Sequence, residues 1–225
     1  MGSETPSEAP WTPQSVLSTL PYPPEEDSTS PVPFFHLLER LKTTKREGWR
    51  RFDINHGESI SDHMYRMSIM TMLAPPSLAS RLDLPRCMKM ALVHDMAESL
   101  VGDITPVDPI KKTEKARREA AVMEYISKTL LRGVPSGMLA GDDILAVFNE
   151  YEANETLEAQ FVHDVDKMEL LLQMVEYERS YEIDLAEFLN VSNRIHLPEI
   201  QEWAATVLQE REALWKKRQE QQPTA

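Results

Sequence analysis

Cysteine is almost absent from this chain of 225 residues, in which Cys87 stands alone. A single cysteine cannot form an internal disulfide, and in an apolar stretch it is expected to act as a small core residue. No apolar run is long enough to cross a bilayer, and the first residues lack the basic flank and apolar centre of a signal peptide. We therefore expect no disulfide and no membrane, and a protein of the cytoplasm or of cytoplasm and nucleus.

Positive charge is also scarce, because 24 Lys and Arg face 37 Asp and Glu for a formal net charge of −13. This balance argues against a nucleic acid polymer or an anionic membrane as the main partner. Basic residues nevertheless gather in one region: Arg40, Lys42, Lys45, Arg46, Arg50, Arg51 and Arg66. Such a patch in an acidic protein is compatible with a small phosphorylated ligand, and equally with a solvated helix face.

Glycine is sparse too, with 7 residues against 16 prolines, and the prolines are clustered. Residues 1–31 combine many of them with Ser, Thr and Glu. That composition cannot bury enough apolar surface to order itself, so it predicts a disordered leader. We expect a single domain over residues 32–212 and a charged tail over 213–225.

No alternating apolar pattern is long enough to predict a β-sheet, whereas apolar residues recur with the period of an α-helix along most of the chain. The predicted helices cover about residues 33–46, 59–73, 83–101, 111–131, 138–153, 155–180, 184–192 and a last one from 198. The fold class is therefore all-α, with about seven or eight helices around one core.

The stretch from Cys87 to Val101 is apolar on nearly every side, which is typical of a buried helix. His94, Asp95 and Glu98 lie within it, and residues three or four apart on a helix are neighbours. Burying two carboxylates with an imidazole is costly unless a cation pairs with them. Since His and Asp are ordinary ligands of divalent ions, we predict a metal site here.

Two further ligands are candidates on other helices. His63 lies among Met64, Met67 and Ile60, although a histidine on an apolar helix can also be a hydrogen-bonded core residue. Asp166 lies at the edge of the apolar face of the helix predicted over 155–180. The nearby pair 163–164, His followed by Asp, is rejected because its flanks are partly polar and no carboxylate follows three residues after the Asp.

These residues resemble the metal signature of the HD-domain superfamily of phosphohydrolases, in which His, the pair His-Asp and a distant Asp follow one another on separate helices. Two segments carry a closer resemblance to the HD domain-containing protein 2 group, which is related to bacterial 5′-deoxynucleotidases. They are Glu58-Ser-Ile-Ser-Asp-His63-Met-Tyr-Arg66 and Leu92-Val-His-Asp-Met-Ala-Glu98-Ser-Leu-Val-Gly-Asp103-Ile104. The similarity covers about residues 33–212.

The resemblance implies a homodimeric, metal-dependent phosphatase of deoxyribonucleoside 5′-monophosphates. The divalent ion would be Mn, Co, Mg, Zn or Fe. It would be held by four side chains: His63, His94, Asp95 and Asp166.

The same resemblance makes Glu98 and Asp103 the acid/base group and the sugar- or phosphate-side group. Alternatively, these two carboxylates and the backbone oxygen of Ile104 bind a second ion. Trp49 falls where the family has a tryptophan that contacts substrate.

This sequence departs from the bacterial pattern just before Trp49, where Gly48 replaces an arginine. Arg46, Arg50 and Arg51 are the candidates to bind the phosphate in its place.

The chemistry fits the residues, because an ion-activated water supplies a nucleophile at neutral pH and the ion neutralises phosphate charge. Glu98, one helical turn from His94, could exchange a proton with that water or with the leaving 5′-oxygen. For Glu98 the alternative role is to orient His94, for Asp103 to cap a loop, and for Trp49 to fill the core.

Two other functions stay open. Other HD proteins hydrolyse nucleoside triphosphates, cyclic nucleotides or guanosine alarmones, although the alarmone hydrolases typically carry a second acid where this chain has Ser99. The other alternative is a metal-stabilised scaffold without turnover, which the acids at 98 and 103 argue against and Gly48 mildly favours.

Overall fold

The computed structural model of the chain describes residues 10–221, which form helices joined by turns and loops, with no β-strand among them. The helices are α1 (Pro13–Leu17), α2 (Val32–Thr43), α3 (Glu47–Arg50), α4 (Ile60–Met72), α5 (Pro76–Ala79), α6 (Leu84–Val93), α7 (Glu98–Val101), α8 (Lys112–Tyr125), α9 (Gly137–Ala153), α10 (Leu157–Tyr181) and α11 (Pro198–Gln221). A π-helical segment (Ile126–Leu130) follows α8, and a 3₁₀-helix (Ala186–Arg194) precedes α11. The all-α prediction is confirmed, with more helices than expected because several are single turns.

The described helices form two compact units, each built from two separate stretches of chain. The first unit comprises the chain up to Ser61 and Asp95–Ala146, and the second comprises Asp62–His94 and the chain from Val147 onward. None of the helices within residues 10–221 is both long and apolar enough to traverse a bilayer.

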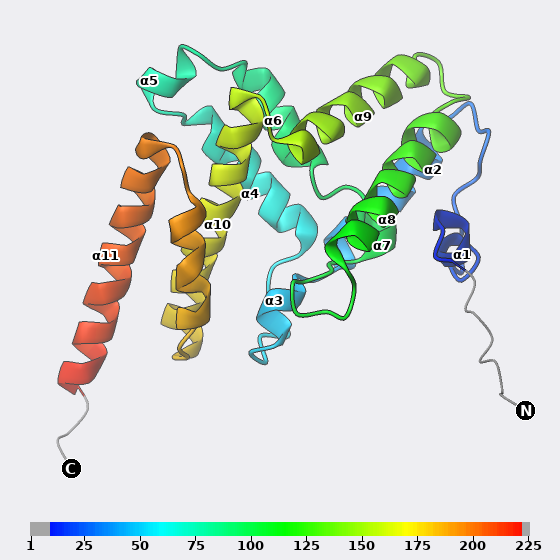
Figure 1. Ribbon diagram of the computed structural model, residues 1–225. Helices are drawn as coiled ribbons and strands as arrows, with labels where there is room; N and C mark the ends of the chain where they lie inside the picture. The colour runs from blue at the N-terminus through cyan, green and yellow to red at the C-terminus, as the bar shows by residue number, and fades with distance from the viewer. Residues whose placement is uncertain (1–9, 222–225) are drawn as a thin grey trace, which may run out of the picture. The chain divides into compact units, whose positions relative to one another are not determined.

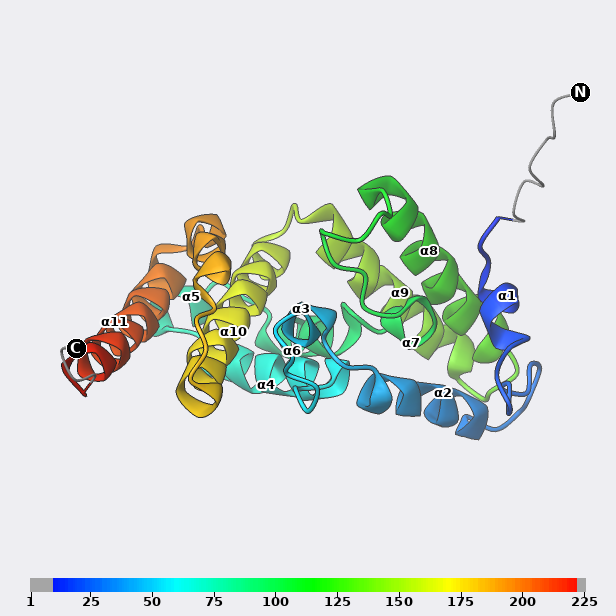
Figure 2. The same ribbon diagram turned by 90° about the horizontal axis from the view of Figure 1, so that it is seen from below.

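In the first unit, α2, α7 and α8 pack together, and α1 lies against α7 and α8 (Figure 2). The prediction of a disordered leader is wrong for residues 10–31, because Leu17 is buried and Thr12 caps α1 by accepting a hydrogen bond from the Ser15 amide. The Arg118 guanidinium also lies 5.3 Å from the ring centre of Trp11. A few apolar and cation–π contacts thus order a segment whose composition alone suggested none; residues 1–9 lie outside the described part.

The single helix predicted over 83–101 is in fact two helices, α6 and α7, separated by tight turns. The carbonyls of Asp95, Met96 and Ala97, which lie between the two helices, each accept from the amide three residues later, at 3.0–3.2 Å. The apolar residues on all sides therefore predicted that this stretch is buried, but they did not predict where its helix is interrupted. Gly102, with a φ of +77°, ends α7 as predicted.

The second unit is built around α10, which packs against α6 and α11 (Figure 1). Its buried side includes Phe161, Val165 and Leu171. From α6, Cys87 is buried in the same unit, and burial, with the charge of Glu158, raises the pKa of its thiol to about 12.

Helix α11 continues through the region predicted to be a charged tail. It runs to Gln221, and its Trp215 indole donates a hydrogen bond of 2.9 Å to Glu178 on α10. Arg211 donates to the same carboxylate at 2.8 Å. The predicted boundary at residue 212 therefore falls inside a packed helix. Composition could not show that polar side chains of this region bond to a carboxylate on α10.

Candidate active site

Three of the four predicted metal ligands come together within the second unit. His63 lies on α4, His94 directly follows α6, and Asp166 lies on α10. The His63 Nε2 atom is 3.2 Å from Asp166 Oδ1, and the rings of His63 and His94 lie 5.6 Å apart between centroids. Both imidazoles are buried, so three helices distant in sequence present metal-binding side chains to one place.

Hydrogen bonds fix the tautomer of both imidazoles. His63 Nδ1 lies 2.7 Å from Glu169 Oε2, and His94 Nδ1 lies 3.0 Å from the Ala91 carbonyl oxygen. Because an ionised carboxylate and a carbonyl can only accept, each Nδ1 carries a proton, and each Nε2 is the atom that would offer a lone pair to a bound ion. Two imidazole Nε2 atoms with a carboxylate are an ordinary donor set for a divalent ion, so these residues fit the predicted metal.

Glu169 contacts one of the predicted metal ligands, and the sequence analysis did not single it out. Its fully buried carboxylate accepts from His63 and also from Arg66 Nε at 2.8 Å. Arg66 in turn donates to Glu176 at 2.7 Å and to Gln173 at 2.8 Å. The sequence offered one indication of its role: it is a charged residue on the apolar face of the helix predicted over 155–180.

The rejected pair at 163–164 has structural roles in the same unit. The His163 ring stacks on Tyr151 with centroids 3.9 Å apart, and its Nε2–H donates to the Tyr151 carbonyl at 3.0 Å. Burial lowers the pKa of His163, which keeps this ring neutral. Asp164 accepts from the amides of His196 and Leu197 at 2.9 and 2.7 Å, just before α11 begins.

Asp95, the fourth predicted ligand, follows His94 in the chain and belongs to the first unit. There its carboxylate accepts a hydrogen bond of 3.2 Å from Arg46. Of the arginines proposed for phosphate, Arg46 therefore lies beside a predicted metal ligand, whereas Arg50 pairs with Glu47 at the exposed surface.

Glu98 is a buried carboxyl of the first unit, with 2% of its side chain exposed. Burial, and then the negative charges of Asp95 and Asp103, raise its pKa well above the ordinary range, against the opposing effect of Lys115 and Arg46. Among the described residues, nothing forms a hydrogen bond with Glu98 Oε2. A buried carboxyl with a raised pKa can both take and give a proton near neutral pH.

The remaining predicted residues of the first unit have defined partners. Asp103 accepts from the Glu47 amide at 2.7 Å, and the Ile104 carbonyl accepts from Lys115 Nζ at 3.0 Å. The Trp49 indole, 2% exposed, donates to Glu58 at 2.8 Å. Trp49 is thus packed in the core, and its proposed contact with a base stays a prediction.

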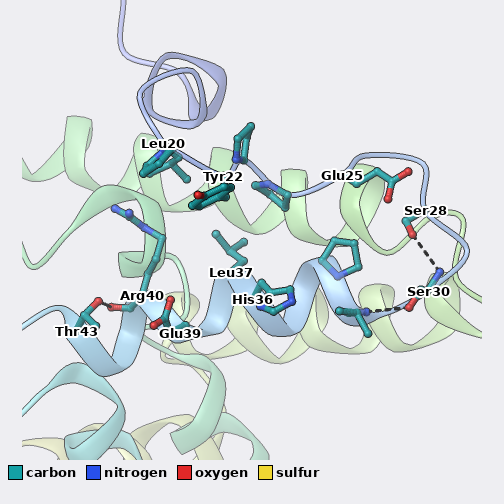
Figure 3. Close-up of a pocket in the computed structure, with 15 residues that line it drawn as sticks. Leu20, Tyr22, Glu25, Ser28, Ser30, His36, Leu37, Glu39, Arg40 and Thr43 are labelled. Atoms are coloured by element: carbon teal, nitrogen blue, oxygen red, sulfur yellow. Dashed lines mark hydrogen bonds between the residues drawn. The ribbon is translucent and has the colours of Figure 1, made fainter.

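An open pocket of about 970 Å³ in the first unit involves other residues. Figure 3 shows Leu20 and Tyr22 facing His36 and Arg40 of α2 across it. None of the residues predicted for catalysis, substrate or metal lines this pocket.

Comparison with known proteins identifies the family of the chain. A sequence model of the HD domain matches residues 38–204, which is more than half of the chain. The chain belongs to the HD domain family. The match includes parts of both units and all of the residues from Arg46 to Asp166 discussed here.

Several HD domain relatives carry a name for one activity. The chain is 47% identical over 192 residues to 5′-deoxynucleotidase hdd1 of Schizosaccharomyces pombe, covering 84% of this chain and 93% of that protein. It is 41% identical over 145 residues to human 5′-deoxynucleotidase HDDC2, covering 64% and 67%.

The fold is also found in solved structures. The structure of the HD domain-containing protein YGK1 superposes with a TM-score of 0.63 at 31% identity, covering 91% of this chain and 99% of that one. A conserved protein of Pyrococcus furiosus superposes with a TM-score of 0.65 at 25% identity, covering 81% and 99%.

Proposed function

We propose that this protein is a metal-dependent 5′-deoxynucleotidase, which hydrolyses deoxyribonucleoside 5′-monophosphates to deoxynucleosides and phosphate. The observation that carries the proposal is the 47% identity to a protein named for that activity, over nearly the whole of both chains. The set formed by the buried His63 and His94 and the part-exposed Asp166 supports it, because it provides ligands that such a reaction needs.

His63, His94, Asp95 and Asp166 would hold a divalent ion, which we propose to be Mn, Co, Mg, Zn or Fe. When bound, the ion lowers the pKa of water and neutralises phosphate charge. The protein's own contribution to the metal site is orientation: Glu169 and the Ala91 carbonyl hold the Nδ1 protons so that both imidazoles present Nε2.

Glu98 is proposed to move the proton. Its raised pKa and buried Oε2 suit a group that accepts a proton during attack and returns it to the leaving 5′-oxygen. Asp103 is proposed to act on the sugar or phosphate side.

Arg46 is proposed to bind the phosphate, since an arginine fork matches phosphate oxygens. Arg46 lies beside the predicted metal ligand Asp95, whereas Arg50 pairs with Glu47 at the exposed surface. A homodimer and a cytoplasmic location complete the proposal.

The test is phosphate release by metal-stripped protein that is resupplied with a single metal at a time. The substrates are deoxy- and ribonucleoside 5′-monophosphates, 3′-monophosphates and a deoxynucleoside triphosphate. Metal-dependent release from the 5′-deoxymonophosphates alone is expected. Release from the triphosphate alone would assign another HD activity, and no release with metal bound would favour a scaffold.

A further inference from the structure

The two histidines among the predicted metal ligands are held in different ways. His63 bonds through Nδ1 to the buried carboxylate of Glu169 on another helix, at 2.7 Å. His94 lies where α6 ends and bonds instead to the Ala91 carbonyl, three residues earlier in its own helix, at 3.0 Å. One bond to a neighbouring turn leaves an imidazole able to rotate about that bond. A ligating ring in this position therefore gains from packing that fixes its Nε2 atom.

Tyr151 of α9 makes such a packing contact with the His94 ring. The two ring centres lie 4.9 Å apart, with an angle of 55° between the planes. Tyr151 is 6% exposed, so its ring is packed in the core and is not a mobile surface side chain. The backbone beside it is also anchored, because Glu150 forms an ion pair with Arg86 of α6 and accepts from Thr156 Oγ1 at 2.7 Å. The end of α9 is thus tied to the helix that ends at His94.

His163 of α10 holds Tyr151 by two contacts. Its ring stacks on the Tyr151 ring, with centroids 3.9 Å apart and an angle of 16° between the planes, and its Nε2–H donates to the Tyr151 carbonyl at 3.0 Å. One side chain therefore fixes both the ring and the backbone of Tyr151. His163 also lies one helical turn before Asp166, so α10 carries one predicted ligand and the support of another. These residues all belong to the second unit.

We propose that Tyr151 and His163 are positioning residues of the metal site: the Tyr151 ring, held by His163, limits rotation of the His94 imidazole and so raises the affinity for the bound ion. His163 acts through Tyr151, and neither residue is a ligand. The inference deepens the proposed function and rests on it in so far as His94 is a metal ligand.

The test is binding of Co²⁺ to metal-stripped full-length protein, measured by calorimetry and by the visible d–d absorption of the bound ion. Tyr151→Leu removes the aromatic ring. It should weaken binding about tenfold and change the absorption spectrum, because the geometry of the ligands is no longer fixed. Tyr151→Phe, which keeps the ring, should bind within about twofold of wild type and show the wild-type spectrum.

His163→Leu tests the path through Tyr151 independently. It should weaken Co²⁺ binding at least about threefold, since the stacking and the hydrogen bond that hold Tyr151 are lost. Because His163 acts only through the Tyr151 ring, adding His163→Leu to Tyr151→Leu should cause no further loss of affinity. Losses that multiply in the double variant would overturn the proposed path.

Glu178→Ala is the control for general destabilisation of the second unit. Glu178 lies about 18 Å from Asp166 along α10, at 1.5 Å per residue. The variant should lower the melting temperature but leave the affinity for Co²⁺ and the spectrum unchanged. Circular dichroism establishes that each variant is folded, and Tyr151→Met replaces Tyr151→Leu if the latter is not.

Wild-type affinity and spectrum in Tyr151→Leu would overturn the proposal, as would an equal loss of affinity in Glu178→Ala. Neither result depends on turnover. Failure of the nucleotidase proposal would appear separately, as absence of phosphate release by wild type with the metal bound.

Discussion

At the scale of single residues, the predicted metal ligand His63 is held by a buried neighbour, Glu169. Glu169 accepts the Nδ1 proton of His63 and is held by Arg66. Such carboxylate partners fix the ring and raise the basicity of the ligating nitrogen. The sequence could not show this pairing, because positions 63 and 169 are distant in the chain and their contact exists only in the fold.

We expect Glu169→Gln to weaken binding of Mn²⁺ at His63 by about 10–100-fold, because the carboxylate that orients His63 is lost. Calorimetry on metal-stripped protein measures this. The matched control is Glu176→Gln, which removes the other carboxylate bound to Arg66 but lies 46% exposed. Equal losses in the two variants would mean that Arg66, and not the orientation of His63, determines the effect.

Glu98→Gln should lower turnover about 100-fold or more, because an amide cannot take up a proton. Mn²⁺ should still bind at His63 and His94. Phosphate release and calorimetry on the same sample separate the two effects. Near-normal turnover would assign the proton transfer to another group.

Glu98 also makes stability depend on pH. Its pKa is raised by burial and by Asp95 and Asp103, so the folded protein binds this proton more tightly than the unfolded chain. Its stabilising contribution is complete below the ordinary pKa of Glu and is lost as pH rises through the raised value. The free energy of unfolding of metal-stripped wild type should therefore fall more between about pH 5 and about pH 8 than that of Glu98→Gln, as measured by urea titration.

At the scale of helices, sequence periodicity located most elements but not their ends or joints. The apolar stripes at 59–73, 138–153 and 155–180 match α4, α9 and α10 to within about two residues. The joint between α6 and α7 was invisible, because apolar residues on all sides indicate burial and not a continuous backbone. Helix α1 was missed because its few contacts are specific ones in a segment poor in apolar residues.

Helices α10 and α11 are joined by a buried carboxylate, and this gives a prediction at the same scale. Glu178 accepts from the Leu185 amide at 2.9 Å as well as from Arg211 and Trp215. Glu178→Ala should lower the free energy of unfolding by about 3 kcal/mol, since it leaves buried donors and a charge uncompensated.

The control is Glu210→Ala, which breaks an ion pair with Arg179 whose two side chains are each more than half exposed. Such a pair contributes at most about 1 kcal/mol. Comparable losses in both variants would show that Glu178 does not anchor α11.

At the scale of the whole molecule, the HD domain match spans residues from both compact units, so the two units are parts of one evolutionary domain. The sequence placed all the candidate residues inside that range but could not divide the chain, because each unit is assembled from two distant stretches. A homodimer is part of the proposal. Light scattering coupled to size-exclusion chromatography should give twice the mass of one chain, and a monomer mass at micromolar concentration would contradict it.

Because Cys87 is buried, the rate at which its thiol is alkylated can measure local opening of the second unit. A thiolate is the species that reacts with alkylating reagents, and a pKa of about 12 leaves almost none of it at neutral pH, in a side chain that solvent does not reach. Modification of this single thiol must therefore wait until the core around α6 opens. The rate of labelling, measured as a function of metal concentration, would show how strongly a bound ion stabilises the second unit against opening.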